Sequence, residues 1–215
     1  MTGFADRALI AERKIRELFP PTPLQRNDHL SARHGAEIWL KREDLSPVRS
    51  YKLRGASNAM RKVLAETPGQ ELFVCASAGN HAQGVAYAAK HFGVRAVIFM
   101  PVTTPQQKID KTRTFGGDFV EIFLTGDYFD QTLESARAFC AKKDARFLAP
   151  FDDPQVIEGQ ASVAVEILEQ LGAAPDVVVL PVGGGGLAAG VTGYLGSAAP
   201  KTEFRFVEPA GGASF

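Results

Sequence analysis

Residues 177–187 read VVVLPVGGGGL. The apolar run Val177–Leu180 predicts a buried strand, and a helix is expected to begin near Leu187. The four glycines between them let successive backbone N–H groups turn toward one anion without side-chain clash. The following helix adds unpaired N–H groups and the positive end of its dipole. This stretch therefore predicts a strand–loop–helix unit that binds a phosphate.

Strands and helices alternate along the rest of the 215-residue chain. The strands are near-continuous apolar runs, as expected when both faces of a sheet are covered. Strands separated by helical segments of about 10–15 residues are typical of parallel βαβ units. We therefore predict an α/β, doubly wound fold. The predicted strands are 38–41, 72–76, 96–100, 119–123, 146–149, 177–180 and 203–207, and the predicted helices are 4–19, 50–64, 80–91, 105–115, 128–142, 158–171 and one from about 187.

The bulk composition excludes several classes of partner. The chain has 24 basic and 24 acidic residues and a formal net charge of zero, so it shows no electrostatic footprint for nucleic acid or an anionic membrane. No apolar run is long enough for a membrane span, and charged residues interrupt the N-terminal segment, which is not a signal peptide. Cys75 and Cys140 lack metal-ligand spacing and form no disulfide framework. We expect no metal site and a cytoplasmic location.

The identity of the bound phosphate stays open at this point. Gly183, Gly185 and Ala188 match the G-x-G-x-x-A pattern of dinucleotide-binding loops, and Glu208 follows where an acid could bind a ribose. A phosphate-binding P-loop is excluded because no Lys-Ser or Lys-Thr pair follows the glycines. The simplest alternative is a tight turn with no ligand.

A second strand-to-helix loop is Ser77-Ala78-Gly79-Asn80-His81. In open α/β sheets, ligands bind beyond the carboxyl ends of the strands. The turn and the helix that starts there form a second anion site, which would fit a carboxylate. Ser and Asn at such positions are also common helix caps, and His81 alone is more typical of a capping or packed histidine.

The third segment of interest is Arg49-Ser50-Tyr51-Lys52-Leu53-Arg54-Gly55-Ala56. If Ser50 caps the predicted helix, Lys52 lies in its first turn, where the dipole disfavours an ammonium. The apolar neighbours Tyr51 and Leu53 would desolvate the amine, which also lowers its pKa. A lowered pKa is what a Schiff-base lysine needs, although most lysines are simply solvated surface charges.

Seven segments, taken in their order along the chain, resemble the fold-type II pyridoxal-phosphate enzymes, and most closely the threonine dehydratases. They extend from about residue 22 to 209, and the ordered set disfavours the dinucleotide interpretation. The segments are Thr22-Pro23-Leu24, Lys41-Arg42-Glu43-Asp44, Arg49–Ala56, Ser77–Gly84, Pro150-Phe151-Asp152-Asp153, Ile157-Glu158-Gly159-Gln160 and Gly183–Leu187.

The resemblance implies a fold similar to the β subunit of tryptophan synthase, in which a smaller domain is inserted into a larger one. We expect residues 1–52 and 153–215 in the larger domain and 53–152 in the smaller domain. By the same resemblance, Lys52 holds pyridoxal 5'-phosphate through a Schiff base, and Asn80 hydrogen-bonds the ring hydroxyl. The cofactor phosphate would bind Gly183, Gly184, Gly185, Gly186 and Leu187, and the substrate carboxylate Ser77, Ala78, Gly79, Asn80 and His81.

The implied reaction is β-elimination from L-threonine, giving 2-oxobutanoate and ammonia, with serine as a second substrate. The cofactor delocalises the carbanion, and Lys52 is expected to remove the α-proton. Alternatives are a serine dehydratase, a serine racemase, a β-replacement synthase or a protein that binds without catalysis. The full-length form is expected to be a homo-oligomer. Relatives continue beyond the position of Phe215, so we expect an incomplete larger domain, an unpaired edge at Glu203–Val207 and little or no activity from this chain.

Overall fold

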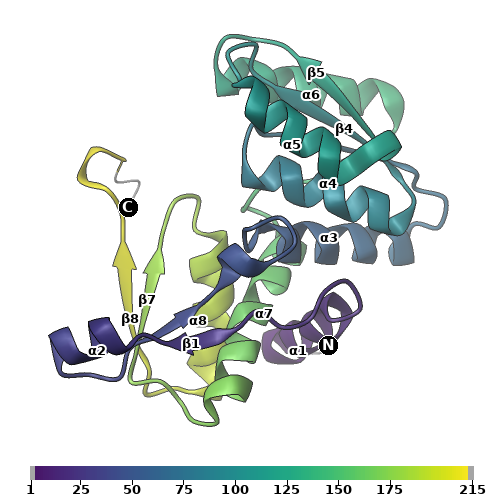
Figure 1. Ribbon diagram of the computed structural model, residues 1–215. Coiled ribbons are helices and arrows are strands. Elements are labelled where there is room, and N and C mark those ends of the chain that lie inside the picture. The colour runs from purple at the N-terminus through teal and green to yellow at the C-terminus, as the bar shows by residue number, and fades with distance from the viewer. Residues whose placement is uncertain (1–2, 213–215) are drawn as a thin grey trace.

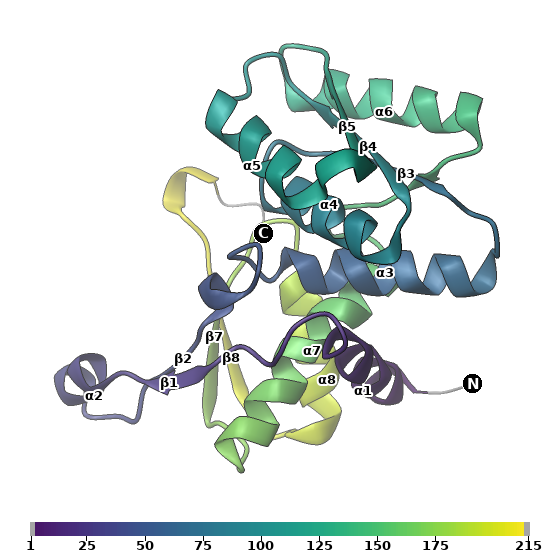
Figure 2. The same cartoon turned by 45° about the vertical axis from the view of Figure 1, so that its right-hand side comes forward.

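The computed structural model describes residues 3–212. Figures 1 and 2 show two groups of elements, with the long helix α3 (Lys52–Glu66) between them. One group holds a four-stranded sheet and its helices, and the other holds the helices near both ends of the chain together with two small sheets.

The four-stranded sheet is parallel throughout, with the strand order β5-β4-β3-β6. Successive side chains of a strand point to opposite faces, so Phe73 and Cys75 pack with α4 while Val74 and Ala76 pack with α6. Both faces of the sheet are therefore covered. The elements are β3 (Leu72–Ala76), α4 (Asn80–Phe92), β4 (Arg95–Met100), α5 (Gln106–Gly116), a 3-10 turn η2 (Gly117–Phe119), β5 (Val120–Leu124), α6 (Phe129–Lys143) and β6 (Arg146–Phe147).

The second group is built around α7 (Pro154–Leu171), which packs against α1 (Phe4–Ile15), α3 and α8 (Gly186–Ala198). Asp153 caps α7 by accepting hydrogen bonds from the N–H groups of Gln155 and Val156, and Pro154 occupies the first turn. The crossing of α3 and α7 is close, because a Cβ atom on Gly159 would lie 2.6 Å from the carbonyl oxygen of Arg54. The two helix backbones are therefore in direct contact at the first turns of α3.

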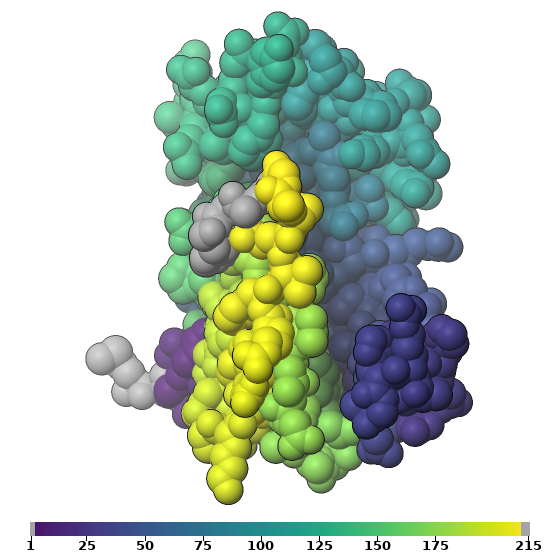
Figure 3. Space-filling model, turned by 90° about the vertical axis from the view of Figure 1, so that its left-hand side faces the viewer, coloured from purple at the N-terminus to yellow at the C-terminus, as the bar shows by residue number. Residues whose placement is uncertain are grey.

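The strands β7 (Val177–Pro181) and β8 (Glu203–Val207) form a separate parallel pair. Val178 and Leu180 pack against α8, whereas Val179 on the other face is 64% exposed. Among residues 3–212, β8 pairs with β7 and with no other strand. Figure 3 shows β8 in yellow along the surface of the molecule.

A small antiparallel pair, β1 (Leu24–Arg26) and β2 (Trp39–Lys41), flanks the short helix α2 (Asp28–His34). Only β2 was expected from the sequence. The strand β1 has three residues and α2 has seven, so both are shorter than the stretches over which hydrophobic periodicity can be recognised. The 3-10 turn η1 (Glu43–Leu45) follows β2, and η3 (Ala210–Gly212) follows β8.

The predicted parallel α/β architecture is confirmed, and all seven predicted strands occur within a few residues of their expected bounds. Some local predictions differ from the structure, since α1 ends at Ile15 rather than at 19 and α7 begins at Pro154 rather than at 158. Ser50 does not cap α3, which starts at Lys52 with Tyr51 at the N-cap position and no side-chain cap hydrogen bond. Within residues 3–212, no helix combines the length and the apolar character needed to cross a membrane.

Candidate functional site around Lys52 and the glycine loop

Lys52 is the first residue of α3 and is delivered by a strained turn. Arg49 adopts a left-handed φ of 57°, which is uncommon for a residue other than glycine. The turn is closed by Ser46, whose hydroxyl accepts from the N–H of Ser50 at 2.9 Å and donates to its carbonyl oxygen at 3.0 Å. The Ser50 hydroxyl in turn accepts from the backbone N–H of Lys52 at 3.2 Å. The backbone at Lys52 is therefore fixed before the helix begins.

The amine of Lys52 has one protein acceptor among the described residues. Its Nζ donates to the carbonyl oxygen of Pro150 at 2.6 Å, and it lies 5.5 Å from the ring centre of Tyr51 and 5.9 Å from that of Phe151. Burial lowers the pKa of this amine below its ordinary value of 10.5, because a partly desolvated ammonium is less stable. This is the direction predicted from the sequence, and it shifts the equilibrium of Lys52 toward the uncharged amine.

The segment from Leu148 to Phe151 also contacts His81. The carbonyl oxygen of Leu148 lies 3.0 Å from Nε2 of His81, two residues before the carbonyl that holds Lys52. His81 is 3% exposed, and burial lowers its pKa to about 4 despite the hydrogen bond to Leu148. The ring is thus neutral near pH 7, with Nε2 as the donor. His81 is a packed histidine, as its sequence context favoured.

The loop from Ser77 to His81 joins β3 to α4, and the start of α4 lies close to Lys52. The hydroxyl of Ser77 accepts from the N–H of Gly79 at 3.2 Å, which shapes the loop. Asn80 is the first residue of α4 and is exposed, and no described residue hydrogen-bonds its side chain. One turn later, Gly84 packs on the backbone of Lys52 and Leu53, since its Cβ would come within 3.1 Å of them.

The glycine loop lies between β7 and α8, as predicted. Gly185 has a left-handed φ of 78°, which glycine adopts without steric cost, and α8 starts at Gly186. Among residues 3–212, nothing accepts a hydrogen bond from the N–H groups of Gly183, Gly184 or Gly185. The first N–H groups of α8 have no partner within their own helix. The loop therefore presents a row of free donors to an anion.

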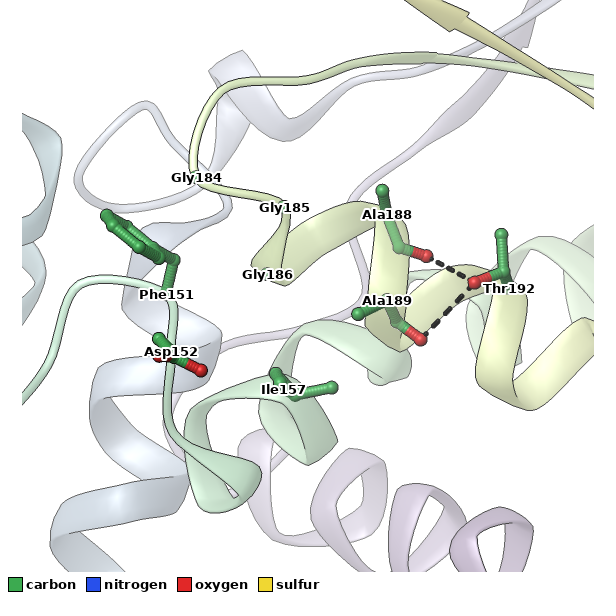
Figure 4. Close-up of a pocket in the computed structure, with 9 residues that line it drawn as sticks. All are labelled: Phe151, Asp152, Ile157, Gly184, Gly185, Gly186, Ala188, Ala189 and Thr192. Atoms are coloured by element: carbon green, nitrogen blue, oxygen red, sulfur yellow. Dashed lines mark hydrogen bonds between the residues drawn. The ribbon is translucent and has the colours of Figure 1, made fainter. Parts of the chain in front are cut away.

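Phe151 connects the glycine loop to the Lys52 amine. A Cβ atom on Gly184 would lie 2.3 Å from the Phe151 ring, and one on Gly186 would lie 3.0 Å from the Phe151 backbone. Figure 4 shows the Phe151 ring directed toward Gly184. The same ring is 5.9 Å from Nζ of Lys52. The structure thus brings the loop and the amine to a single shared residue.

A pocket of about 470 Å³ borders the glycine loop (Figure 4). Its walls come from Phe151 and Asp152, from Ile157 on α7, and from α8, where Thr192 donates to the carbonyl oxygen of Ala188 at 2.7 Å. Lys52 is not among the lining residues. The hydrogen bonds and the contacts of Phe151, rather than this pocket, therefore locate the Lys52 amine.

The residues present fit pyridoxal phosphate in two respects. A half-buried amine with a lowered pKa is suited to covalent attachment to an aldehyde. A glycine loop with unpaired N–H groups at a helix N-terminus is suited to a phosphate dianion. Side chains at Gly184 or Gly186 would collide with Phe151, so the loop can approach that residue only without them.

The sequence did not reveal three features in and around the site. The acceptor of the Lys52 amine is a main-chain carbonyl at Pro150, and every residue carries such a group. Phe151 stands in a motif that resembles the family, but nothing in the motif indicates that its ring would lie near both the amine and the loop. A cluster of buried charges around Arg54 was also missed, because each of its members is an ordinary charged residue in the sequence.

Several known proteins are similar to this chain. It is 49% identical over 207 residues to the biosynthetic L-threonine dehydratase of Bacillus subtilis strain 168, covering 96% of this chain and 49% of that protein. The processed form of threonine deaminase isoform 2 from Solanum lycopersicum superposes with a TM-score of 0.88 at 41% identity, covering 96% and 55% of the two chains. Maize serine racemase gives a TM-score of 0.90 at 27% identity, covering 98% and 63%.

These comparisons differ in how much of each protein they cover. The chain spans about half the length of the curated relatives it matches. The family match is nearly complete on this chain, since residues 15–215 match the pyridoxal-phosphate dependent enzymes. The structural neighbours share the same fold-type II architecture. The chain therefore belongs to the pyridoxal-phosphate dependent enzyme family.

Proposed function

We propose that this protein is a pyridoxal-phosphate dependent L-threonine dehydratase, which converts L-threonine to 2-oxobutanoate and ammonia by β-elimination. The observation that carries the proposal is the half-buried amine of Lys52, held 2.6 Å from the Pro150 carbonyl and next to the ring that supports the glycine loop. The similarity to a threonine dehydratase and a threonine deaminase supports threonine as the substrate.

The proposed roles of the site residues rest on the family resemblance and are supported by their positions. Lys52 would hold the cofactor covalently, and the N–H groups of Gly183, Gly184, Gly185, Gly186 and Leu187 would bind its phosphate. The side chain of Asn80 would bind the ring hydroxyl. The loop formed by Ser77, Ala78, Gly79, Asn80 and His81 would bind the substrate carboxylate, using donors at the start of α4. When bound, pyridoxal phosphate supplies an electron sink for the negative charge left by the departing α-proton.

Lys52 is the residue suited to move that proton. An amine can act as a general base only in its uncharged form. Burial lowers the pKa of Lys52, which shifts the equilibrium toward that form. The start of α4 packs on the Lys52 backbone through Gly84, which supports the proposal that the loop before α4 binds the substrate carboxylate near the amine. Elimination of the β-hydroxyl, followed by hydrolysis of the enamine, then gives the keto acid and ammonia.

The remaining expectations from the sequence stay predictions. We propose that residues 1–52 and 153–215 belong to the larger domain and residues 53–152 to the smaller, inserted one. We also propose a cytoplasmic location and a homo-oligomeric full-length form. Sedimentation of the purified full-length protein would test the homo-oligomeric state.

The first experiment maps the covalent bond. The protein is mixed with pyridoxal phosphate, reduced with borohydride and digested, and the labelled lysine is identified by mass spectrometry. We expect the label on Lys52 and its loss in Lys52→Ala, while Lys142→Ala, an exposed lysine on α6, keeps it. A label that maps to another lysine would refute the proposed role of Lys52.

The second experiment separates the substrates. Release of 2-oxobutanoate from L-threonine and of pyruvate from L-serine is followed in one preparation of the full-length form, with its Lys52→Ala variant as the blank. Faster release from threonine is expected. Release from serine alone, or racemisation of serine without keto-acid release, would replace threonine dehydratase by one of the alternative activities.

A further inference from the structure

A cluster of buried charges lies under the first turn of α3, beginning at Arg54. The Arg54 side chain is fully buried. Its Nε and Nη2 donate to Glu43 at 2.8 and 2.9 Å, and its Nη1 and Nη2 donate to Glu166 at 2.6 and 2.8 Å. Further hydrogen bonds reach Ser162 at 3.0 Å and Thr22 at 3.2 Å. One guanidinium thus holds two carboxylates at once, each in a two-point contact.

A fourth charge completes the cluster. Nζ of Lys41 donates to Glu166 at 2.5 Å and to the carbonyl oxygen of Thr22 at 2.6 Å, and the Lys41 side chain is only 8% exposed. The cluster formed by Arg54, Lys41, Glu43 and Glu166 therefore has two positive and two negative charges. Such a balanced set can be buried at a tolerable cost only if its geometry is fixed.

The cluster joins three separate parts of the chain. Glu43 lies in η1, directly after β2, Arg54 lies in α3, and Glu166 lies in α7. The backbones of α3 and α7 are in contact where the helices cross, because a Cβ on Gly159 would lie 2.6 Å from the Arg54 carbonyl oxygen and 2.7 Å from the Gly55 Cα. A shift of α3 along α7 would therefore break hydrogen bonds and create backbone clashes together.

Arg54 does not face the amine of Lys52. Two residues along a helix are rotated by about 200°, so the two side chains leave α3 on opposite sides. Arg54 is connected to the Lys52–Pro150 hydrogen bond in two ways: through the α3 backbone to Lys52, and through α7 to the segment that carries Pro150. Pro150, the acceptor of the Lys52 amine, lies four residues before Pro154, where α7 begins. Fixing α3 on α7 therefore fixes both ends of the Lys52–Pro150 hydrogen bond.

We propose that Arg54, with Glu43 and Glu166, is a positioning cluster that clamps the first turn of α3 onto α7 and thereby holds Nζ of Lys52 at the Pro150 carbonyl, facing the glycine loop through Phe151. Its importance for catalysis rests on the proposed function of Lys52. The positioning itself is a property of this chain that can be measured without cofactor.

The alternative is that the cluster only stabilises the fold. The chain offers a matched control for that alternative in Glu158, which also lies on α7 and has a 5% exposed side chain. Glu158 pairs with Arg7 of α1 at 2.6 Å and with Lys62, on a later turn of α3, at 2.8 Å. Its removal should weaken the same helix packing away from the first turn of α3.

The experiment compares Arg54→Lys, Glu43→Gln and Glu158→Gln with the unaltered protein. Lysine keeps the charge of Arg54 but cannot contact two carboxylates with a planar fork. Glu43→Gln is the milder variant, because this carboxylate is 15% exposed. Each protein, free of pyridoxal phosphate, is acetylated with trace acetic anhydride over a range of pH, and each lysine is quantified by mass spectrometry. The exposed Lys142 serves as the internal reference.

We expect the titration midpoint of Lys52 to lie below the ordinary lysine value of 10.5 in the unaltered protein. In Arg54→Lys and Glu43→Gln the Lys52 midpoint should move up toward that value, because a loosened first turn hydrates the amine. It should stay in place in Glu158→Gln. Covalent uptake of pyridoxal phosphate, trapped with borohydride, should slow by about 100-fold in Arg54→Lys, as expected for a misplacement of about 1 Å.

Two results would overturn the proposal. One is an unchanged Lys52 midpoint in both cluster variants. The other is an equal change in Glu158→Gln, which would assign the effect to general loosening of α7. If the label instead maps to a lysine other than Lys52, the proposed function fails while the acetylation result still decides the positioning. If Arg54→Lys does not fold, Glu43→Gln carries the same comparison.

Discussion

Replacing Gly159 by alanine tests the close crossing of α3 and α7. The new Cβ would lie 2.6 Å from the carbonyl oxygen of Arg54, 2.7 Å from the Cα of Gly55 and 2.9 Å from the carbonyl carbon of Arg54. All three atoms belong to backbone, so no side chain can rotate away. The two helices must separate instead.

The magnitude follows from this geometry. An ordinary contact begins at 3.4 Å, so α3 must move by about 0.8 Å away from α7 at this point. Overpacking of this kind costs about 1–3 kcal/mol of unfolding free energy. For a chain of this size, each kcal/mol lowers the melting temperature by about 2–4 °C. Because α3 carries Lys52, covalent uptake of pyridoxal phosphate should fall by about 100-fold.

The matched control is Gly196→Ala. Gly196 lies in α8 on the surface, and no atom lies within 4 Å of the place that an alanine methyl group would take, so alanine should gain about 0.5–1 kcal/mol of helix stability. Thermal melting and borohydride trapping are measured for both variants. If Gly159→Ala melts and traps pyridoxal phosphate like the unaltered protein, the close crossing does not set the position of Lys52.

Three further outcomes are expected. Burial acts to raise the pKa of Glu166, but hydrogen bonds from Arg54 and Lys41 outweigh burial, so the pKa is lower in the folded protein than the ordinary value of 4.5. The ionised carboxylate therefore stabilises the fold above pH 4.5, and this stabilisation is lost as the pH falls through the folded pKa. Glu166→Gln should remove this pH dependence of the unfolding free energy, measured by acid denaturation. His81, with a pKa of about 4, should show no NMR titration between about pH 5.5 and 8. Gly184→Ala should weaken pyridoxal-phosphate binding, and adding Phe151→Ala should restore part of it, measured as a double-mutant cycle.

Much of the fold was predictable because each buried strand is a continuous run of apolar residues that can be recognised without knowing its neighbours. The run Leu72–Ala76 was expected with the bounds that the structure has, since five apolar residues between polar ones fit a strand covered on both faces. The start of α7 lies four residues before the position that the apolar period predicts, at the typical cap and first-turn pair Asp153-Pro154. At this helix the capping residues mark the first turn more accurately than the apolar period does.

The elements that were missed depend on tertiary contacts. Strand β1 exists because Leu24–Arg26 pairs with Trp39–Lys41, and three residues carry no period of their own. The helix α2 is held by Asn27, whose side chain accepts from the N–H of Leu30 at 2.9 Å, and it ends at Gly35 with a φ of 60°. Such local caps can be recognised in the sequence, but they become decisive only once the flanking strands are paired.

The candidate site was predictable where the chemistry depends on residue type. Lys52 and the glycines between β7 and α8 were singled out because an amine near a helix start and a row of free N–H groups have distinctive functions. The cluster around Arg54 was not, since the carboxylates of Glu43 and Glu166 come from distant segments that only the fold brings together. Long-range charge pairing leaves no pattern in a single sequence.

The partner of the Lys52 amine has a consequence for mutational surveys. A main-chain oxygen is present whatever side chain occupies position 150, so scanning substitutions at that position leaves the acceptor atom in place. The group also does not ionise, so acid or base changes this contact only through the amine itself. Replacing the peptide bond after Pro150 with an ester, by chemical ligation, would weaken the carbonyl oxygen as an acceptor. This change would measure the contribution of the Lys52–Pro150 hydrogen bond, which side-chain substitutions at position 150 leave unchanged.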